Sequence, residues 1–205
     1  MFISFEGIEG SGKSTQIKLL SEKLKDLGHD VKTLREPGTT IMGEKIREIF
    51  LEDTQEQVDP ITEAFLLYAS RKHLDQNFLR KNISDGCIVI ADRYADATIA
   101  YQCYGKGLDK DFIEKIHKSS DLLVPDLTFY IDISVETSRN RISDRKMDRM
   151  ESESVEFFEH VRTGYLEIAS KNPDRFISLD GNLTIDQLEI EIAKKTLERL
   201  DASLG

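Results

Sequence analysis

The stretch FEGIEGSGKST, residues 5–15, contains the pattern G-x-x-x-x-G-K-[ST] between Gly7 and Ser14. It follows the short apolar run MFISF (1–5) directly and precedes a segment with the apolar spacing of a helix. Glycines let consecutive backbone N–H groups turn inward around phosphate oxygens, and the positive end of the following helix points at them. The lysine of the pattern can reach the β- and γ-phosphates, and the final hydroxyl can bind Mg²⁺. The sequence therefore predicts a site for nucleotide phosphates in this loop.

The predicted nucleotide-binding residues are Gly7, Ile8, Glu9, Gly10, Ser11, Gly12, Lys13, Ser14 and Thr15. Within this set Lys13 is a candidate catalytic cation and Ser14 a candidate metal ligand. Glu9 does not fit simple phosphate binding, because a carboxylate repels ATP. We expect its side chain to face a hydroxyl group or the metal shell, with a solvated loop residue as the alternative.

The rest of the chain alternates short apolar runs with longer amphipathic segments. Ile17, Leu20, Leu24 and Leu27 form one helical stripe, which ends at Gly28. Near-continuous apolar strands flanked by helices are typical of a parallel sheet that is buried on both faces. We predict an α/β fold, a doubly wound five-stranded parallel sheet flanked by helices. The predicted strands are 1–5, 30–34, 87–91, 127–133 and 175–179.

Length and composition set limits on the class of protein. The chain has 205 residues, enough for one large domain, and we expect a single domain over 1–205 with a mobile, charge-dense lid at about 141–153. Its net charge of −10 makes the average surface repel a polyanion, so we expect no nucleic-acid partner. No segment resembles a signal peptide or a bilayer span, so we expect no membrane contact and a cytoplasmic location.

Ligands of such sheets bind beyond the carboxyl ends of the strands, where Asp92 and Arg93 follow the third run. Asp92 can hold Mg²⁺ through water, as the acid that accompanies this kind of loop does. The planar fork of Arg93 suits a pair of phosphate oxygens. Asp132 follows the fourth run, but Asp92 has the better context, and we interpret Asp132 as structural.

Several other residues are interpreted as structural. Cys87 and Cys103 are too few for a zinc site or a disulfide framework and are expected to be buried apolar residues. The histidines show no ligand spacing. The core face of the helix after the lid is expected to comprise Phe157, Phe158, Tyr165 and Leu166.

Five motifs in order along nearly the whole chain resemble the thymidylate kinase family. They are FEGIEGSGKST (5–15), REPGTT (35–40) leading to GEKIRE (43–48), LLYASR (66–71), DRYADATIAYQ (92–102) and DRMESESVEFFEHVRTGY (148–165). The resemblance implies a P-loop kinase that transfers the γ-phosphoryl group of ATP to dTMP, with ATP and Mg²⁺ as cofactors and a homodimeric assembly.

The resemblance also implies roles for single residues. Glu9 would contact the deoxyribose 3′-hydroxyl or metal-bound water, and Arg47 and Arg93 would hold the dTMP phosphate. Arg71 would read a polar edge of thymine, and Glu36-Pro37 occupies a position where the family often has a cis peptide bond. The full set of implied substrate-binding residues is Glu36, Arg47, Leu67, Arg71, Arg93, Ala97, Tyr101 and Gln102. In that set Gln102 helps to fix the base, and Tyr101 stands where a ribose 2′-hydroxyl would need to fit.

Three positions depart from the family pattern. Leu67 stands where an aromatic residue usually stacks on the base, Ala97 replaces a serine, and Thr39 replaces a glycine. Losing an aromatic face costs about 1 kcal/mol of stacking. A relaxed preference that admits dUMP or another deoxynucleotide is therefore an expectation.

The expected mechanism follows from charge. The second pKa of a phosphate monoester lies near 6, so the attacking oxygen is mostly ionised at pH 7 and needs no general base. Transfer instead needs positive charge at the moving group. Arg141, Arg145 and Arg149 recur at a spacing of four, which places them on one face if the lid becomes helical over ATP. We expect Arg145 or Arg149 to reach the γ-phosphoryl group; a solvated face paired with neighbouring acids is the alternative.

Two other functions stay open on the sequence. One is another deoxynucleoside monophosphate kinase with a relaxed base preference. The other is a nucleotide-dependent switch ATPase, although acceptor-type arginines at 47, 71 and 93 have no purpose in a switch.

Overall fold

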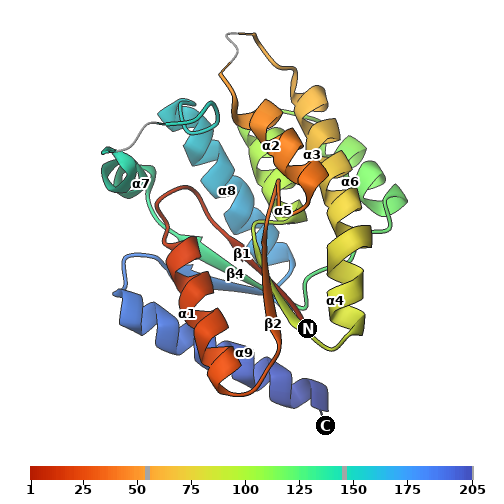
Figure 1. Ribbon diagram of the computed structural model, residues 1–205. Helices are drawn as coiled ribbons and strands as arrows, with labels where there is room; N and C mark the ends of the chain where they lie inside the picture. Colours follow the sequence, from red (N-terminus) through yellow and green to blue (C-terminus); the bar gives the residue numbers. More distant parts are fainter. Residues whose placement is uncertain (54–55, 145–146, 205) are drawn as a thin grey trace.

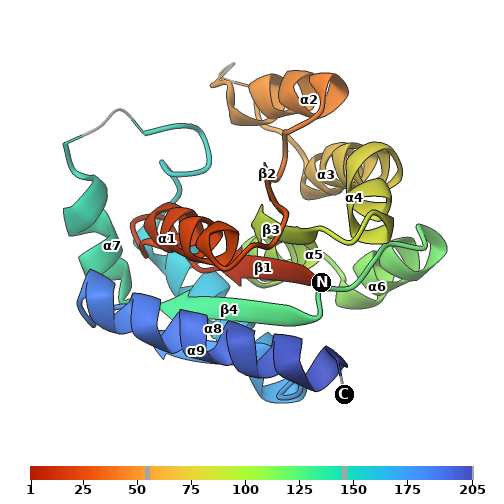
Figure 2. The same cartoon turned by 60° about the horizontal axis from the view of Figure 1, so that its bottom comes forward.

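The computed structural model describes residues 1–53, 56–144 and 147–204, with the side chains of 203 and 204 left aside. Its sheet has five parallel strands in the order β2-β3-β1-β4-β5, as Figures 1 and 2 show from two sides. This arrangement confirms the predicted fold class. The strands are β1 (Phe2–Glu6), β2 (Val31–Arg35), β3 (Ile88–Asp92), β4 (Leu127–Asp132) and β5 (Phe176–Asp180).

Helices follow the strands and cover both faces of the sheet. They are α1 (Lys13–Asp26), α2 (Ile41–Leu51), α3 (Pro60–Leu74), the π-helix η1 (Asp75–Leu79), α4 (Arg80–Ser84), α5 (Ala95–Thr98), the π-helix η2 (Ile99–Gly105), α6 (Lys110–Ser119), α7 (Val135–Ile142), α8 (Val155–Lys171) and α9 (Ile185–Leu204). One core lies between the sheet and the pair α1 and α9, and a second one includes α8 and η2. Figure 1 shows α1 and α9 next to each other, and the two helices are in contact.

The central strands are buried on both faces of the sheet. All five residues of β1 are buried, and so are the first four of β3, whereas the edge strands β2 and β5 each have two buried and two exposed residues. A central strand of this kind is mostly apolar, and this is why its position could be predicted from the sequence. The register pairs Phe5 with Asp92, so the loop after β1 and the acid at the end of β3 reach the same edge of the sheet.

Helices α2 and α3 each begin at a polar capping residue. The Thr40 side chain accepts from Gly43 N at the start of α2, and the Asp59 side chain accepts from Ile61 N at the start of α3. Such caps satisfy backbone N–H groups that have no partner within the helix. Figure 1 shows α2 and α3 side by side; α2 follows β2 in the chain and lies beyond the carboxyl end of that strand.

The lid does not form one helix in this structure. Helix α7 ends at Ile142, and α8 begins only at Val155, where the Ser154 side chain accepts from Phe157 N. The described residues between the two helices are turns and loop, so Arg141 and Arg149 do not share a helix face. The predicted role of Arg145 lies outside the described residues.

Most of the residues interpreted as structural are buried or paired, but Leu166 is not buried. Phe157, Phe158 and Tyr165 are buried, but Leu166 is 44% exposed, so its assignment to the core face was wrong. The reason is helical geometry, since the buried stripe of α8 runs through 157, 161, 165 and 168 and leaves 166 on the other side. Asp132 accepts from the Arg162 guanidinium at 2.8 and 2.9 Å, which is a structural ion pair.

The part of the chain that the structure describes contains no helix long and apolar enough to cross a membrane. Cys87 and Cys103 are both free and buried, as expected for small apolar residues.

Candidate functional site

The loop between β1 and α1 is wrapped around the amine of Lys13. The Lys13 Nζ group donates to the carbonyl oxygens of Gly7 (2.9 Å) and Ile8 (3.1 Å). Burial, followed by the charge of Arg93, lowers the pKa of this amine to about 8. The amine is therefore held inside the loop, at the place where the phosphates of a nucleotide would meet it.

Helix α7 packs directly on this loop at Gly10. Gly10 has φ +74°, and a Cβ there would lie 3.2 Å from Ser138 O and from the Arg141 Cβ. Ser138 Oγ donates to Glu9 O at 2.7 Å, and Arg141 Nη1 donates to Gly10 O at 3.1 Å. Glycine is thus required both by the backbone conformation and by the close approach of α7. Arg141 also donates to Gly181 O at 3.0 Å, which joins the loop to the turn after β5.

Ser14 and Asp92 form the candidate metal site. Ser14 Oγ donates to Asp92 Oδ2 at 3.1 Å, so a hydroxyl and a carboxylate oxygen meet at the start of α1. Oxygen donors of this kind fit Mg²⁺, which usually takes one or two protein ligands together with phosphates and water. Within the described ranges, no group of three or more His, Cys, Asp and Glu residues could hold a metal ion. The donor set therefore fits an ion that arrives with a nucleotide.

Arg93 links this loop to a neighbouring cavity. Its φ is +68°, and its guanidinium donates to Gly7 O (2.7 Å) and to a Glu9 carboxylate oxygen (2.5 Å). The guanidinium carbon lies 4.9 Å from the ring centre of Tyr101, whose hydroxyl donates to Glu9 at 3.0 Å. Burial raises the pKa of Glu9, but Arg93 and Lys13 together bring it below its usual value. Glu9 thus faces the Tyr101 hydroxyl and the Arg93 guanidinium, and its contact with a substrate hydroxyl or a metal shell stays a prediction.

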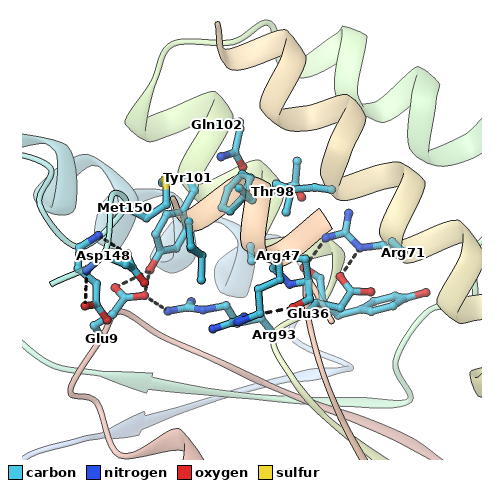
Figure 3. Close-up of a pocket in the computed structure, with 17 residues that line it drawn as sticks. Glu9, Glu36, Arg47, Arg71, Arg93, Thr98, Tyr101, Gln102, Asp148 and Met150 are labelled. Atoms are coloured by element: carbon cyan, nitrogen blue, oxygen red, sulfur yellow. Dashed lines mark hydrogen bonds and ion pairs between the residues drawn. The ribbon is translucent and has the colours of Figure 1, made fainter. Parts of the chain in front are cut away.

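All eight residues that the sequence predicts for substrate binding line one cavity. This cavity encloses about 640 Å³ of empty space, including its open mouth. Figure 3 shows Glu9 toward one end and Arg71 with Glu36 toward the other. A cavity lined by apolar side chains and a few converging polar groups is typical of a small-molecule site. The predicted residues that line it are Glu36, Arg47, Leu67, Arg71, Arg93, Ala97, Tyr101 and Gln102.

Arg71 is buried at the far end of the cavity. Its Nε donates to Glu36 Oε2 at 2.6 Å, and its guanidinium lies 5.0 Å from the Tyr68 ring centre and 5.5 Å from that of Tyr94. The remaining nitrogen, Nη1, is buried and has no hydrogen-bond partner. The Glu36-Pro37 peptide bond is cis. An unpaired guanidinium donor in a cavity wall is costly to bury, so it points to a ligand with an acceptor.

Gln102 has an unpaired acceptor in the same cavity wall. Its Nε2 donates to Glu63 Oε2 at 3.1 Å, whereas its Oε1 is buried without a partner. The unpaired buried atoms among the described residues of the cavity lining are Arg71 Nη1, Gln102 Oε1, Glu36 Oε1, Tyr94 Oη and Thr98 Oγ1. A flat ring with an acceptor next to a donor on its edge would satisfy Arg71 Nη1 and Gln102 Oε1.

Comparison with known proteins agrees with this geometry. The family model for thymidylate kinase matches residues 5–192. The chain belongs to the thymidylate kinase family. It is 41% identical to a thymidylate kinase of Prosthecochloris aestuarii, covering 97% of this chain and 94% of that protein, and 45% identical to one of Sulfurihydrogenibium sp., covering 92% of each. A crystal structure of the thymidylate kinase of Ehrlichia chaffeensis superposes with a TM-score of 0.80 at 32% identity, covering 96% of this chain and 98% of that one.

Thymidylate kinases are nucleoside monophosphate kinases, so this chain is a phosphotransferase. The five motifs that predicted the family lie within or adjacent to the loop, the cavity and the lid. The resemblance found in the sequence is confirmed.

One departure from the thymidylate kinase pattern has a local explanation. Thr39 replaces a glycine and has φ +70°, a conformation that β-branched residues rarely adopt. Two hydrogen bonds hold it there: Thr39 N donates to Glu44 Oε1 at 2.6 Å, and Thr39 Oγ1 accepts from Arg35 N at 2.8 Å. The threonine side chain thus offsets part of the strain that a glycine would avoid.

Arg149 contacts α2 and α3 and not the loop between β1 and α1. Its Nη1 donates to Glu63 Oε1 at 2.6 Å, and its Nε and Nη2 donate to Phe50 O at 3.0 and 2.8 Å. These three contacts join the lid to the end of α2 and to α3. To reach a γ-phosphoryl group Arg149 would have to leave them.

Sequence reasoning did not identify two side chains that support the site, Glu6 and Tyr165. Glu6 is buried and accepts from Tyr94 N and from the Tyr165 hydroxyl, each at 2.8 Å. Burial, followed by the charge of Asp96, raises the pKa of Glu6 to about 8. Tyr165 is a predicted core residue, yet its hydroxyl also accepts a hydrogen bond from Arg93 Nη1 at 3.2 Å. The available signal was an acid directly after a fully apolar run, a position where burial without a partner is rare.

Proposed function

We propose that this chain transfers the γ-phosphoryl group of ATP to dTMP and so forms dTDP and ADP. The observation that carries the proposal is the cavity with a free donor on Arg71 and a free acceptor on Gln102, joined to the phosphate loop through Arg93. A switch ATPase has no use for such a cavity.

The two free groups match one edge of thymine. The O4 atom of thymine accepts hydrogen bonds, and the adjacent N3–H donates. Arg71 Nη1 can donate to O4 while Gln102 Oε1 accepts from N3–H, so that both buried groups gain partners. Tyr101 is buried in the same wall, where the added hydroxyl of a ribonucleotide would need room. These features support a deoxynucleotide with a 4-keto pyrimidine as acceptor.

Two arginines of the cavity would hold the phosphate of the acceptor. Arg47 lines the cavity and donates to Pro37 O at 3.1 Å, and Arg93 lines it and also reaches the loop that would hold ATP. The acceptor oxygen is already mostly ionised at pH 7, so the work of the protein is to orient two anions and to supply positive charge. Lys13 and Arg93 supply it from this chain. Ser14 and Asp92 would hold Mg²⁺, which when bound neutralises phosphate charge.

The lid supplies the remaining positive charge in this proposal. We place Arg145 or Arg149 at the γ-phosphoryl group when the lid closes. For Arg149 this requires release of Glu63 and Phe50 O, which it contacts in the present structure. Arg141 already lies against the loop and bridges it to Gly181, a position that favours a role beside the donor nucleotide.

Two residues of the cavity bear on the choice of base. Leu67 lines the cavity where an aromatic ring would stack on the base, and Ala97 lines it without a hydroxyl. The edge contacts of Arg71 and Gln102 are the same for uracil and thymine, so dUMP is an expected secondary acceptor. The homodimer and the cytoplasmic location stay predictions from the family resemblance and from composition.

A panel of acceptors tests the proposed function. The purified protein is mixed with MgATP and, separately, with dTMP, dUMP, dCMP, dGMP and ribosyl-TMP, and diphosphate formation is followed. We expect dTMP to be the best acceptor and dUMP a weaker one. Preference for dGMP, or no conversion of any monophosphate, would contradict the proposal.

A further inference from the structure

A buried carboxylate, Glu63 on α3, lies behind the wall of the acceptor cavity. The residue is 0% exposed, and both of its carboxylate oxygens have partners. Oε1 accepts from Arg149 Nη1 at 2.6 Å and from Lys106 Nζ at 2.8 Å. Oε2 accepts from Gln102 Nε2 at 3.1 Å. Two cations hold Oε1 in this structure and leave the second oxygen for the amide of Gln102, and Lys106 keeps its contact with Oε1 if Arg149 moves away.

The contact with Glu63 determines which way the Gln102 amide points. A carboxylate only accepts hydrogen bonds, whereas an amide has a donor end and an acceptor end. The end of Gln102 that meets Glu63 must therefore be the NH₂ group. Its oxygen is then turned away from Glu63, and this Oε1 is the buried atom without a partner in the cavity wall. Figure 3 shows Gln102 beside Tyr101 and Thr98 at the cavity.

We propose that Glu63 is a positioning residue for the choice of the acceptor base, because it holds Gln102 with its carbonyl oxygen toward the cavity. This inference rests on the proposed function. A fixed acceptor on Gln102 beside a fixed donor on Arg71 matches N3–H and O4 of thymine or uracil. Cytosine presents an N3 lone pair and an N4 amino group to the same two atoms, so both contacts become repulsive. Glu63 selects against cytosine without touching the base.

The known contacts of Glu63 set this role apart from simple ion pairing. A residue that only neutralised Arg149 and Lys106 would act through Oε1 and would leave base choice unaffected. Because Oε2 accepts from the Gln102 amide, the orientation of that amide depends on whether the group at position 63 can only accept hydrogen bonds or can also donate them. A carboxamide at position 63 can accept or donate, so it would let the Gln102 amide turn over.

The variant Glu63→Gln tests this role by substrate choice. The ratio of kcat/KM for dTMP to that for dCMP is measured for the wild-type enzyme and for E63Q. We expect the ratio to fall about tenfold or more in E63Q, through a gain with dCMP as well as a loss with dTMP. The matched control is Lys106→Met, which removes one cation from the same carboxylate but keeps the Oε2 contact. We expect its ratio to stay within about twofold of the wild type.

The variant Gln102→Ala separates a role through Gln102 from any other effect of Glu63. In this background E63Q should no longer change the dTMP to dCMP ratio. If E63Q lowers the ratio equally with and without Gln102, or leaves it unchanged in the otherwise wild-type enzyme, the inference is wrong. A wild-type enzyme that does not phosphorylate dTMP overturns the proposed function, and the inference with it.

A measurement on the wild-type protein covers the case in which E63Q does not fold. The side-chain amide signals of Gln102 are assigned in a ¹⁵N spectrum by their loss in Gln102→Ala. We expect one Nε2 proton to exchange slowly with solvent, because it is bonded to buried Glu63. Exchange of both protons at the rate of exposed glutamines would overturn the inference, whatever the activity.

Discussion

The Arg93 guanidinium donates to the Glu9 carboxylate at 2.5 Å and at the same time to Gly7 O at 2.7 Å. One side chain therefore contacts the backbone of the phosphate loop and an acid that lines the acceptor cavity. The positive φ of Arg93 turns it toward both, and Tyr94 N next to it is anchored on Glu6 at 2.8 Å. The glycine-rich loop and the cavity are thus joined by the N–H donors of one guanidinium.

Replacing Arg93 with lysine should reduce phosphoryl transfer. Lysine keeps the charge but cannot make the two diverging contacts with Gly7 O and Glu9. We expect kcat with dTMP to fall about 100-fold, because a preorganised donor near the transferring group is lost. Steady-state kinetics measure the effect, and thermal unfolding controls for stability. A kcat within about threefold of the wild type would contradict the role assigned to Arg93.

Binding of ATP should draw a proton onto Lys13 at pH 8. The pKa of this amine is about 8 in the structure, mainly because of burial, and phosphate charge beside it must raise that pKa. At pH 8 about half of the amines are neutral, so binding takes up about half a proton, whereas at pH 6 the amine is already charged and uptake is about zero.

Calorimetry in buffers of different ionisation enthalpy measures this uptake, with a non-hydrolysable MgATP analogue as ligand. Lys13→Arg is the control, because arginine stays protonated at both pH values. Equal uptake at pH 6 and pH 8, or uptake that persists in the control, would show that Lys13 is not the group that titrates.

Glu6→Gln should change how stability depends on pH. The pKa of Glu6 is about 8 in the folded protein and near 4.5 in the unfolded chain, because burial and Asp96 disfavour its charge. Between these values the folded state holds a proton that the unfolded state has released, so stability from this group falls as pH rises from 4.5 to 8. Neutral glutamine removes that loss.

The difference in unfolding free energy between Glu6→Gln and the wild type should move in favour of the variant by up to about 1.4 kcal/mol per pH unit over this window. Urea unfolding at pH 5, 6, 7 and 8 measures it. Parallel curves for the two proteins would mean that Glu6 is already charged in the folded state.

Arg149→Lys tests the lid. If closure carries Arg149 to the γ-phosphoryl group, lysine keeps the charge but loses the planar fork, and we expect kcat to fall at least about tenfold. The contacts with Glu63 and Phe50 O show that the arginine must move first. Pre-steady-state measurement of the transfer step gives the rate without product release. An unchanged rate, with only the KM for dTMP altered, would assign Arg149 to the cavity wall alone.

The sheet could be predicted from the sequence because each buried strand shows itself in the composition of a few consecutive residues. A strand buried on both faces is mostly apolar, and the run at 127–133 became β4 with bounds Leu127–Asp132. The phosphate loop could also be predicted, because Lys13 contacts the backbone of residues within the same short motif. The eight acceptor residues were placed together by resemblance to a family and not by spacing.

The supporting acids and the lid could not be predicted in this way. Glu6 meets Tyr165, which is 159 residues away, and Glu63 meets Arg149 across 86 residues. Only the folded chain shows that these acids have partners. The lid arginines share a four-residue spacing, but the contacts of Arg149 and the cap at Ser154 divide the segment into turns and a new helix. Tertiary contacts outweigh helical spacing there.

The rate of ADP formation from MgATP, with and without dTMP, shows whether the phosphate loop and the cavity act together. We predict that ADP forms at a rate that rises and saturates with dTMP and is lower by about a thousandfold or more without it. ADP formation at the same rate in the absence of any nucleoside monophosphate would contradict the account.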